Sequence, residues 1–254
     1  MTRTHLKHVR VYMDGYDLSG YERSVGAMSQ VFDVAPESAM SDGVQNIVMG
    51  RAAIGMPSFN GFLDNDAAGA FALSNASNGT RNVLVAIGTN AAPAAGNPIF
   101  AWKFEQVGYS VEPGGGFVAA NILFGDASYA SPLTYSTPWG VLLHASGAET
   151  AANTGTGVDD FGAQTTKGGI FVYQLLSSDG SVTLKAQDAS SNLDASFADL
   201  SGATSGSINA SVTPQSGMVA LSTTATVKRY LRWQISLGTA TTATFVCGFI
   251  RNHI

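Results

Sequence analysis

The sequence predicts a mainly β protein made of two β-modules, each with one short helix. Three observations predict this class. Apolar and polar residues alternate with a period of two through most of the chain, as in strands that bury one face. Glycine occurs 29 times, and small residues fill many breaks between the alternating segments, as turns between short strands require. Hydrophobic residues make up 45% of the 254 residues, which is enough to bury a core.

The first half is expected to contain several strands and one helix. The strands are predicted at residues 9–13, 45–63, 81–89, 98–112 and 117–125. Asp14-Gly15 predicts a tight turn after the first strand, and Pro57 marks a bend within the second. Residues 64–75 are rich in alanine and begin with Asp64, Asn65 and Asp66, which can cap a helix. Residues 29–42 are predicted to be a long loop.

The second half is expected to follow a similar course. Residues 127–138 consist mostly of Ser, Thr, Pro and small residues, which is typical of a linker. We therefore place an N-terminal module at 1–128 and a C-terminal module at 137–254. A long loop is predicted at 146–166 and a short helix or helical turn at 190–202. Strands are predicted at 139–145, 168–177, 181–189, 227–238 and 243–252, the last two joined as a hairpin. The shared order hints at a duplication, although no residue-level repeat is present.

The residues that could carry chemistry do not form an enzyme signature. Three of the four histidines lie near the termini, and His144 follows an apolar strand, where a strand-end or interface role is expected. No G-x-S-x-G nucleophile motif occurs. The single cysteine, Cys247, alternates with phenylalanines and is expected to be a small buried hydrophobe. It permits neither a disulfide within the chain nor a cysteine-based metal site.

Acidic and glycine-rich stretches also favour structural roles. The segment "VEPGGGFV" (residues 111–118) lacks the Lys-Ser/Thr pair of a phosphate-binding loop, so we expect a hairpin tip. Asp64–Asp66 are expected to cap a helix, and Asp159-Asp160 to lie in a solvated loop, because neither has calcium-loop spacing. Asp188, Asp194 and Asp199 are expected in turns and caps. We therefore predict no catalytic residue, no cofactor and no metal site, and no enzymatic activity.

The charge of the chain limits the classes of partner that it can bind. The formal net charge is −5, and only 12% of residues are charged. Stable wrapping of nucleic acid needs many basic contacts with phosphates, so DNA binding is disfavoured, whereas passage of DNA without adhesion is compatible with like-charge repulsion. The first ten residues lack the apolar core of a secretory signal, and no apolar run reaches membrane-spanning length. We expect no membrane contact and assembly in the cytoplasm.

Four segments of the chain, two in each half, have a distinctive sequence. The first, "VYMDGYDLSGYERSVG" (residues 11–26), resembles the N-terminal motif of the major tail proteins of long-tailed bacteriophages, in which a strand leads into "DLSxY". "VQNIVMGRAAIGMPSFNGFLDND" (residues 44–66) resembles the next segment, a strand that runs into a short helix. "VYQLLSSDGSVTLKAQDASSNLDASFADLSG" (residues 172–202) and "VKRYLRWQIS" (residues 227–236) are also similar to stretches of these proteins. The loop at 146–166 has no counterpart.

The resemblance implies a tail-tube subunit of the virion, so that the two modules are expected to be β-sandwiches or barrels, each with a short flanking helix. Such proteins close into rings that stack into a tube around a tape-measure protein, which leaves to let DNA through. Further implied partners are the tail terminator and the baseplate or tip proteins at the two ends. Because the chain is long enough for two modules, we favour three chains per ring with pseudo-sixfold symmetry. Six chains, each with a second module projecting outward, are the competing arrangement.

Two alternatives from other classes stay open. One is a capsid decoration or baseplate β-protein, which would form trimers and no tube. The other is a carbohydrate-binding module, which would need exposed aromatic platforms. Trp102, Trp139 and Trp233 all lie in strand patterns that favour burial or an interface instead.

Overall fold

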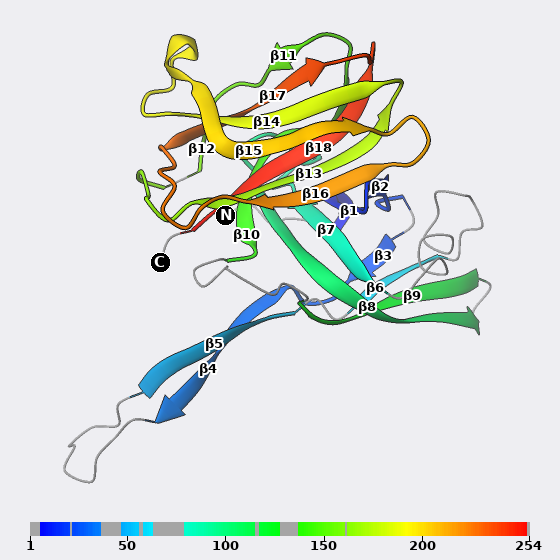
Figure 1. The fold of residues 1–254 in the computed structure, drawn as a ribbon. Helices are drawn as coiled ribbons and strands as arrows, with labels where there is room; N and C mark the ends of the chain where they lie inside the picture. Colours follow the sequence, from blue (N-terminus) through cyan, green and yellow to red (C-terminus); the bar gives the residue numbers. More distant parts are fainter. Residues whose placement is uncertain are drawn as a thin grey trace, which may run out of the picture.

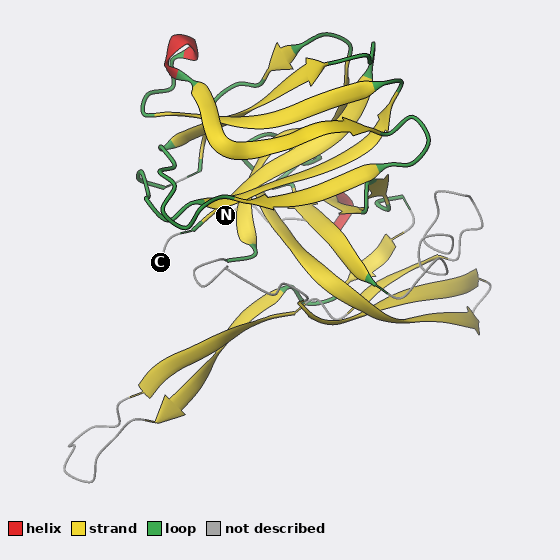
Figure 2. Ribbon diagram, viewed as in Figure 1, coloured by secondary structure: helices red, strands yellow, loops and turns green. Residues whose placement is uncertain are grey.

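The protein is almost entirely β-structure (Figures 1 and 2). The computed structural model describes residues 6–20, 22–36, 47–55, 58–62, 79–114, 117–127, 137–160 and 162–252. The first half contains η1 (Leu6–His8), β1 (Val9–Met13), β2 (Tyr16–Asp17), β3 (Glu22–Val25), β4 (Ser29–Pro36), β5 (Ile47–Gly55), β6 (Ser58–Phe62), β7 (Thr80–Ile87), β8 (Pro98–Gly114) and β9 (Phe117–Ala127). The second half contains β10 (Trp139–Glu149), β11 (Asn153–Thr154), β12 (Val158–Asp159), β13 (Gly169–Ser178), β14 (Ser181–Ala189), η2 (Asp194–Ser196), β15 (Ala198–Asn209), β16 (Gln215–Ala220), β17 (Tyr230–Leu237) and β18 (Ala243–Arg251). The predicted mainly β class is confirmed.

The strands form three antiparallel sheets. The largest has the order β16-β13-β18-β10-β8-β7-β1-β2, and β9, β6 and β3 continue from the far part of β8. The second sheet has the order β11-β17-β14-β15, with β12 also on β17. The third consists of β4 and β5 alone. Strands of both halves pair in the largest sheet, where β8 meets β10 at Phe100↔Trp139.

A β-sandwich forms the upper part of the molecule in Figure 1. The sheet of β14, β15 and β17 covers one face of β10, β13 and β18, and a buried apolar cluster fills the space between them. Its centre contains Phe171, Trp233 and Phe245. Side chains of β13 are buried on both faces, because a second cluster lies behind this strand. Residues 169–175 of this strand are therefore buried without a break rather than alternately, and Gln174 is the one polar side chain among them with an amide.

The second cluster joins the two halves. It contains strand residues of β1, β7 and β8 together with Leu142, Val172 and Val246 from the second half. The largest sheet curls so that its β1–β2 end returns to β13, which encloses these side chains. The modules predicted at 1–128 and 137–254 thus share a core here, and the division of the chain into two modules stays a prediction.

The predicted Asp14-Gly15 turn is present and is buried against the second half. Met13 pairs with Tyr16, and Asp14 and Gly15 have φ of 51° and 85°, as a two-residue hairpin turn requires. Gly15 N donates to Gln174 Oε1 at 2.5 Å. A Cβ on Gly15 would lie 2.6 Å from Pro214 Cβ and 2.9 Å from the Leu175 carbonyl oxygen. Only glycine therefore fits this contact.

Two features project from the body of the protein (Figure 1). β4 and β5 form a ribbon that leaves the sandwich and is paired only within itself. β8 and β9 extend in a different direction, with Gly114 paired with Phe117 at the far end. The hairpin expected for the glycine-rich segment is thereby confirmed.

The predicted helices are corrected in part. The helix expected at 64–75 lies outside the described residues. The helical segment expected at 190–202 is reduced to the three-residue 3-10 helix η2, and β15 begins at Ala198. Asp199 explains this early start, because its carboxylate accepts bonds from Lys185 and Gln187 on the neighbouring β14. Cross-strand side-chain bonds of this kind favour the sheet.

The predicted hairpin of the last two strands is wrong. β17 pairs with β14, whereas β18 pairs with β10 and β13. The intervening loop crosses from one layer of the sandwich to the other, where Asp179 Oδ1 accepts the backbone N–H groups of Thr241 and Thr242 at 2.8 and 2.9 Å. Apolar faces that meet across a sandwich give the same alternation as those of a hairpin.

Two predicted loops contain strands. The loop expected at 29–42 begins with β4, which pairs with β5 from Ser29↔Gly55 to Pro36↔Ile47. The loop expected at 146–166 starts with the end of β10 and contains β11 and β12, both paired with β17. These segments form strands because each pairs with the edge of another strand, although apolar and polar residues do not alternate regularly in their own sequences.

Candidate functional site

His144 is the most enclosed of the candidate chemical groups. It lies inside β10 between two irregularities of the β10–β18 register, so it is not at the strand end. Its Nδ1 is 3.1 Å from the Phe245 carbonyl oxygen, and its Nε2 is 3.3 Å from Glu149 Oε1. The ring stacks on Phe245 and meets the edge of Trp233. Burial lowers the pKa of His144, while its bonds to Glu149 and Phe245 act in the opposite direction.

This environment gives His144 a packing role. Both ring nitrogens are engaged, and the residue is only 9% exposed. Within the described part of the chain, no group of three or more His, Cys, Asp or Glu residues could hold a metal ion. The arrangement around His144 thus offers a polar contact within an aromatic cluster and no open coordination position.

Asp160 is buried, contrary to the solvated loop expected for Asp159-Asp160. Asp160 Oδ2 accepts Arg251 Nε at 2.5 Å, and the two side chains are 5% and 2% exposed. Arg251 also donates to the carbonyl oxygens of Val227 and Lys228 at 2.6 and 2.5 Å. The pair therefore ties the last strand to two loops, whereas Asp159 pairs with Arg229 at the surface.

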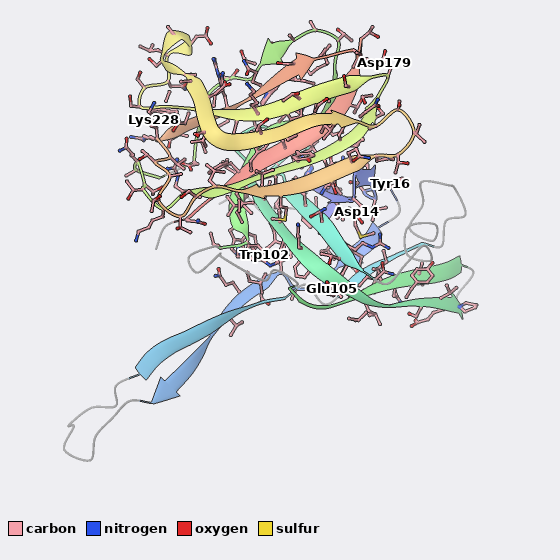
Figure 3. All side chains as sticks on the ribbon, in the orientation of Figure 1. Asp14, Tyr16, Trp102, Glu105, Asp179 and Lys228 are labelled. Carbon is pink, nitrogen blue, oxygen red and sulfur yellow. The ribbon has the colours of Figure 1, made fainter. Side chains whose placement is uncertain are left out.

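The other three acidic residues are mostly in strands rather than in turns. Asp188 is buried in β14 and accepts the backbone N–H of Lys228 at 2.9 Å. Asp199 lies in β15, and only Asp194 occupies the short helix η2. Asp194 pairs with Arg232, whose guanidinium lies 4.4 Å from the centre of the Phe197 ring. These charged groups connect strands and loops of the second sheet. Figure 3 shows Lys228 and Asp179 at opposite sides of the sandwich.

The tryptophans do not form an exposed aromatic platform. Trp233 is 6% exposed and Trp102 is 5% exposed, which confirms the burial expected for both. Trp139 is 38% exposed, but its ring contacts Phe100 edge-on at 5.1 Å between centroids. Cys247 is fully buried, as expected, and burial raises the pKa of its thiol.

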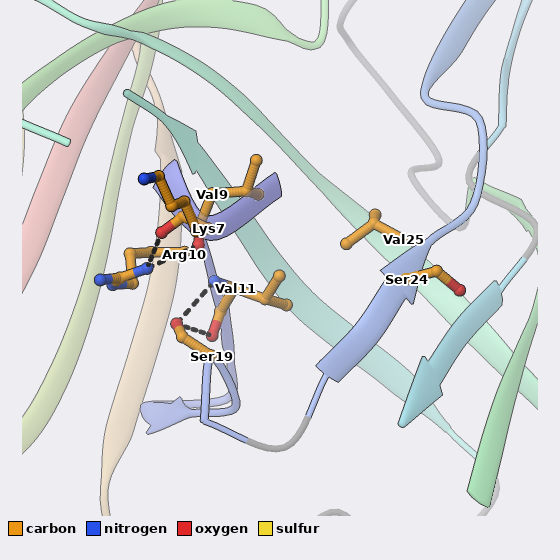
Figure 4. Close-up of a pocket in the computed structure, with 7 residues that line it drawn as sticks. All are labelled: Lys7, Val9, Arg10, Val11, Ser19, Ser24 and Val25. Atoms are coloured by element: carbon orange, nitrogen blue, oxygen red, sulfur yellow. Dashed lines mark hydrogen bonds between the residues drawn. The ribbon is translucent and has the colours of Figure 1, made fainter. Parts of the chain in front are cut away.

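An open hollow lies between β1 and β3 (Figure 4). It is lined by the apolar residues Val9, Val11 and Val25 and by Lys7, Arg10, Ser19 and Ser24. We call it the β1–β3 hollow. Its volume is about 250 Å³, which is below the roughly 300–1,000 Å³ typical of small-molecule sites. Sequence analysis missed it because it joins residues of two strands that do not pair.

The comparisons with known proteins leave the family open. No protein-family model and no curated protein matches the sequence. Among the described residues, no helix is long and apolar enough to cross a membrane. Among solved structures, the chain is similar to the Dit protein of phage SPP1, described as a paradigm of the hub adsorption apparatus in phages that infect Gram-positive bacteria. The match covers 97% of this chain and 99% of that chain at 13% identity, with a TM-score of 0.31. Values this low do not establish a common fold, so we infer function from the chain itself.

Proposed function

We propose that this chain is a structural protein of a bacteriophage tail, and specifically the subunit of the tail tube. In this proposal it forms rings that stack around a tape-measure protein, and the tube conducts DNA during ejection. The terminator and the baseplate or tip proteins bind its two ends. The proposal starts from the segments that resemble major tail proteins, and one structural observation supports its self-assembly.

That observation is the isolated β4–β5 ribbon. Its strands span eight and nine residues and pair only with each other within the described chain. A two-stranded ribbon alone is marginally stable in water, and both of its outer edges present backbone N–H and C=O groups that can pair with another chain. Val31 near its base is 60% exposed. Contact with neighbouring copies would stabilise this ribbon, as ring formation and stacking require.

The charge of the chain is compatible with a DNA conduit. The net charge of −5 is spread over 254 residues, and several of its cations are held in internal ion pairs. A wall of this kind repels the DNA backbone weakly and offers few contacts to retain it. We therefore propose passage of DNA without specific binding, and no role for a cofactor or an enzymatic step.

Electron microscopy of the purified protein tests the proposal. We expect tubes built of stacked rings, with three two-module chains per ring favoured over six chains. Discrete trimers would instead support a decoration or baseplate protein. Monomers that bind glycans would support a carbohydrate-binding module. A protein that stays monomeric at high concentration would overturn the tube assignment.

A shortened ribbon provides the matched control. Val31 pairs with Ala53, so residues 32–52 can be replaced by Asn-Gly, which closes a two-residue hairpin. This variant keeps Ile54, which is buried in the core. We expect its thermal unfolding to match that of the parent while tube formation is lost. Unchanged tubes would show that the ribbon has no part in assembly.

A further inference from the structure

The β1–β3 hollow has an apolar side and a cationic side, and the alternation of β1 explains this. Val9 and Val11 point toward the core cluster, so Arg10 between them points to the opposite face. Val25 of β3 also packs on that cluster, and Ser24 precedes it. Figure 4 shows Lys7 and Arg10 at the β1 side of the hollow and Ser24 and Val25 at the β3 side.

Part of the backbone around the hollow is already bonded within the chain, because Val11 N donates to Ser19 Oγ and the Val11 carbonyl oxygen accepts Leu18 N, both at 2.9 Å. The stretch at Val9 is open to an extended segment. β2 pairs with β1 only from Tyr12 onward, and β3 pairs only with β6 among the described strands. The Val9 carbonyl oxygen accepts Arg10 Nη1 of its own strand at 3.0 Å. No described strand lies beside Val9 on this edge, so another chain can approach it.

The two cations of the hollow have no acidic partner among the described residues. Neither Lys7 nor Arg10 takes part in an ion pair there. Asp17 lies nearby, but its Oδ1 accepts both the backbone N–H and the hydroxyl of Ser19. The hollow therefore favours an occupant in which an apolar side chain is followed by a carboxylate.

The far part of β8 has this pattern. Val111 is 40% exposed, and Glu112 and Pro113 are also exposed. Successive residues of a strand point to opposite faces, so Val111 and Glu112 match the apolar and cationic sides of the hollow. The edge of β8 that pairs with β7 has no described strand beside it beyond Glu105. Figure 1 shows this end of β8 projecting away from β1, so the contact of these residues with the hollow of the same chain is not formed.

We propose that the β1–β3 hollow binds the far end of β8 from a second copy of this chain. Val111 of the second copy packs on the partly buried Val9 and Val25, and its Glu112 carboxylate pairs with Lys7 and Arg10. The inference rests on the proposed self-assembly and names the residues of one contact in it. Because the hollow and the β8 end are different surfaces, the contact is head-to-tail, and such contacts generate rings or filaments.

Cysteine cross-linking between two differently tagged variants tests the contact. One variant carries Arg10→Cys and the other carries Glu112→Cys. We expect a disulfide-linked heterodimer when they are mixed under mild oxidation, and no comparable product from either variant alone. The parent protein carries only the native Cys247, which is 0% exposed. Oxidation of the parent therefore measures the background level of cross-linking. Absence of the mixed product from assembled protein would overturn the inference.

Charge reversal provides a second test by sedimentation. We expect Glu112→Lys, and separately the pair Lys7→Glu with Arg10→Glu, to raise the concentration needed for assembly by about tenfold or more, since like charges at a contact oppose it. Combining the three changes should restore assembly. Val212→Lys, at a residue 93% exposed elsewhere, should leave assembly unchanged.

The outcomes separate the two proposals. If the parent assembles and Glu112→Lys assembles equally well, the contact is wrong and the tail-tube proposal stands. If the parent never assembles, the proposed function and the contact both fail. If Val212→Lys is as harmful as Glu112→Lys, the effect reflects added charge in general, and the inference is refuted.

Discussion

Substitution of Gly15 by alanine tests whether the first turn is packed against the second half of the chain. The residue has φ of +85°, and an added Cβ would lie 2.6 Å from Pro214 Cβ, 2.8 Å from Gln215 N and 2.9 Å from the Leu175 carbonyl oxygen. Two of these atoms are backbone and the third belongs to a proline ring. None can move aside by a simple side-chain rotation, so the turn itself must shift.

The loss of unfolding free energy expected for Gly15→Ala has two parts. A left-handed backbone costs a non-glycine residue about 1–2 kcal/mol, and overpacking a well-filled site costs about 1–3 kcal/mol. We therefore expect Gly15→Ala to lower the free energy of unfolding by about 2–5 kcal/mol. Urea denaturation measures this loss, provided that the m-value is unchanged.

Gly202 is a matched control. Its φ is +84°, and a Cβ there would meet no atom within 4 Å, so Gly202→Ala should show only the backbone cost of about 1–2 kcal/mol. The difference between the two variants isolates the contact with Pro214 and its neighbours. Equal losses for Gly15→Ala and Gly202→Ala would refute the packing of this turn on β13 and β16.

Four further predictions concern stability and reactivity. Trp233→Ala should cost about 3–5 kcal/mol, the usual loss for a buried large aromatic, and an unchanged melting midpoint would show an exposed ring. Asp160→Asn should cost about 3–5 kcal/mol because it leaves the Arg251 guanidinium buried without its anion; a urea midpoint equal to that of the parent would contradict this. Hydrogen bonds from Thr241 and Thr242 lower the pKa of Asp179 to about 2. Its stabilising effect should thus be complete above its ordinary pKa of 3.8 and decline as the pH falls toward 2, and acid titration of Asp179→Asn should lack this component. Cys247 should resist maleimide in the native protein and react after unfolding; rapid native labelling, followed by mass spectrometry, would show that the thiol is accessible.

Sequence reasoning located strands whose signal is local. β7, β8, β9, β13 and β14 were all expected close to their observed positions, because each has an apolar run or alternation bounded by turn residues. The Asp14-Gly15 turn was also predicted, since its backbone requirement is met by those two residues alone. Local chemistry does not show what a turn contacts. The partners of Gly15 lie at Leu175 in β13 and at Pro214, just before β16, which the chain reaches only much later.

Features that depend on distant pairing were missed for the same reason. The sequences of β17 and β18 alternate as those of a hairpin would. Only their pairing, β17 with β14 and β18 with β13, shows that they belong to different layers. Tyr12 alternates with Val11 and Met13 in β1, yet all three are buried, because the curled sheet covers both sides of this strand. Asp160 belongs to a sequence that is typical of a loop. Its side chain is buried because it forms an ion pair with Arg251, near the C-terminal end of the second half.

The distribution of ion pairs links the internal structure to assembly. Of 13 lysines and arginines, six form ion pairs with Asp within the described chain, namely Arg81, Lys185, Lys228, Arg229, Arg232 and Arg251. Lys7 and Arg10, which both line the β1–β3 hollow, form no ion pair within the described chain. Two copies that each carry a charge of −5 repel at long range, and salt screens that repulsion. A desolvated pair of Glu112 with these cations is screened much less, so moderate salt should favour the contact by weakening the repulsion more than the attraction.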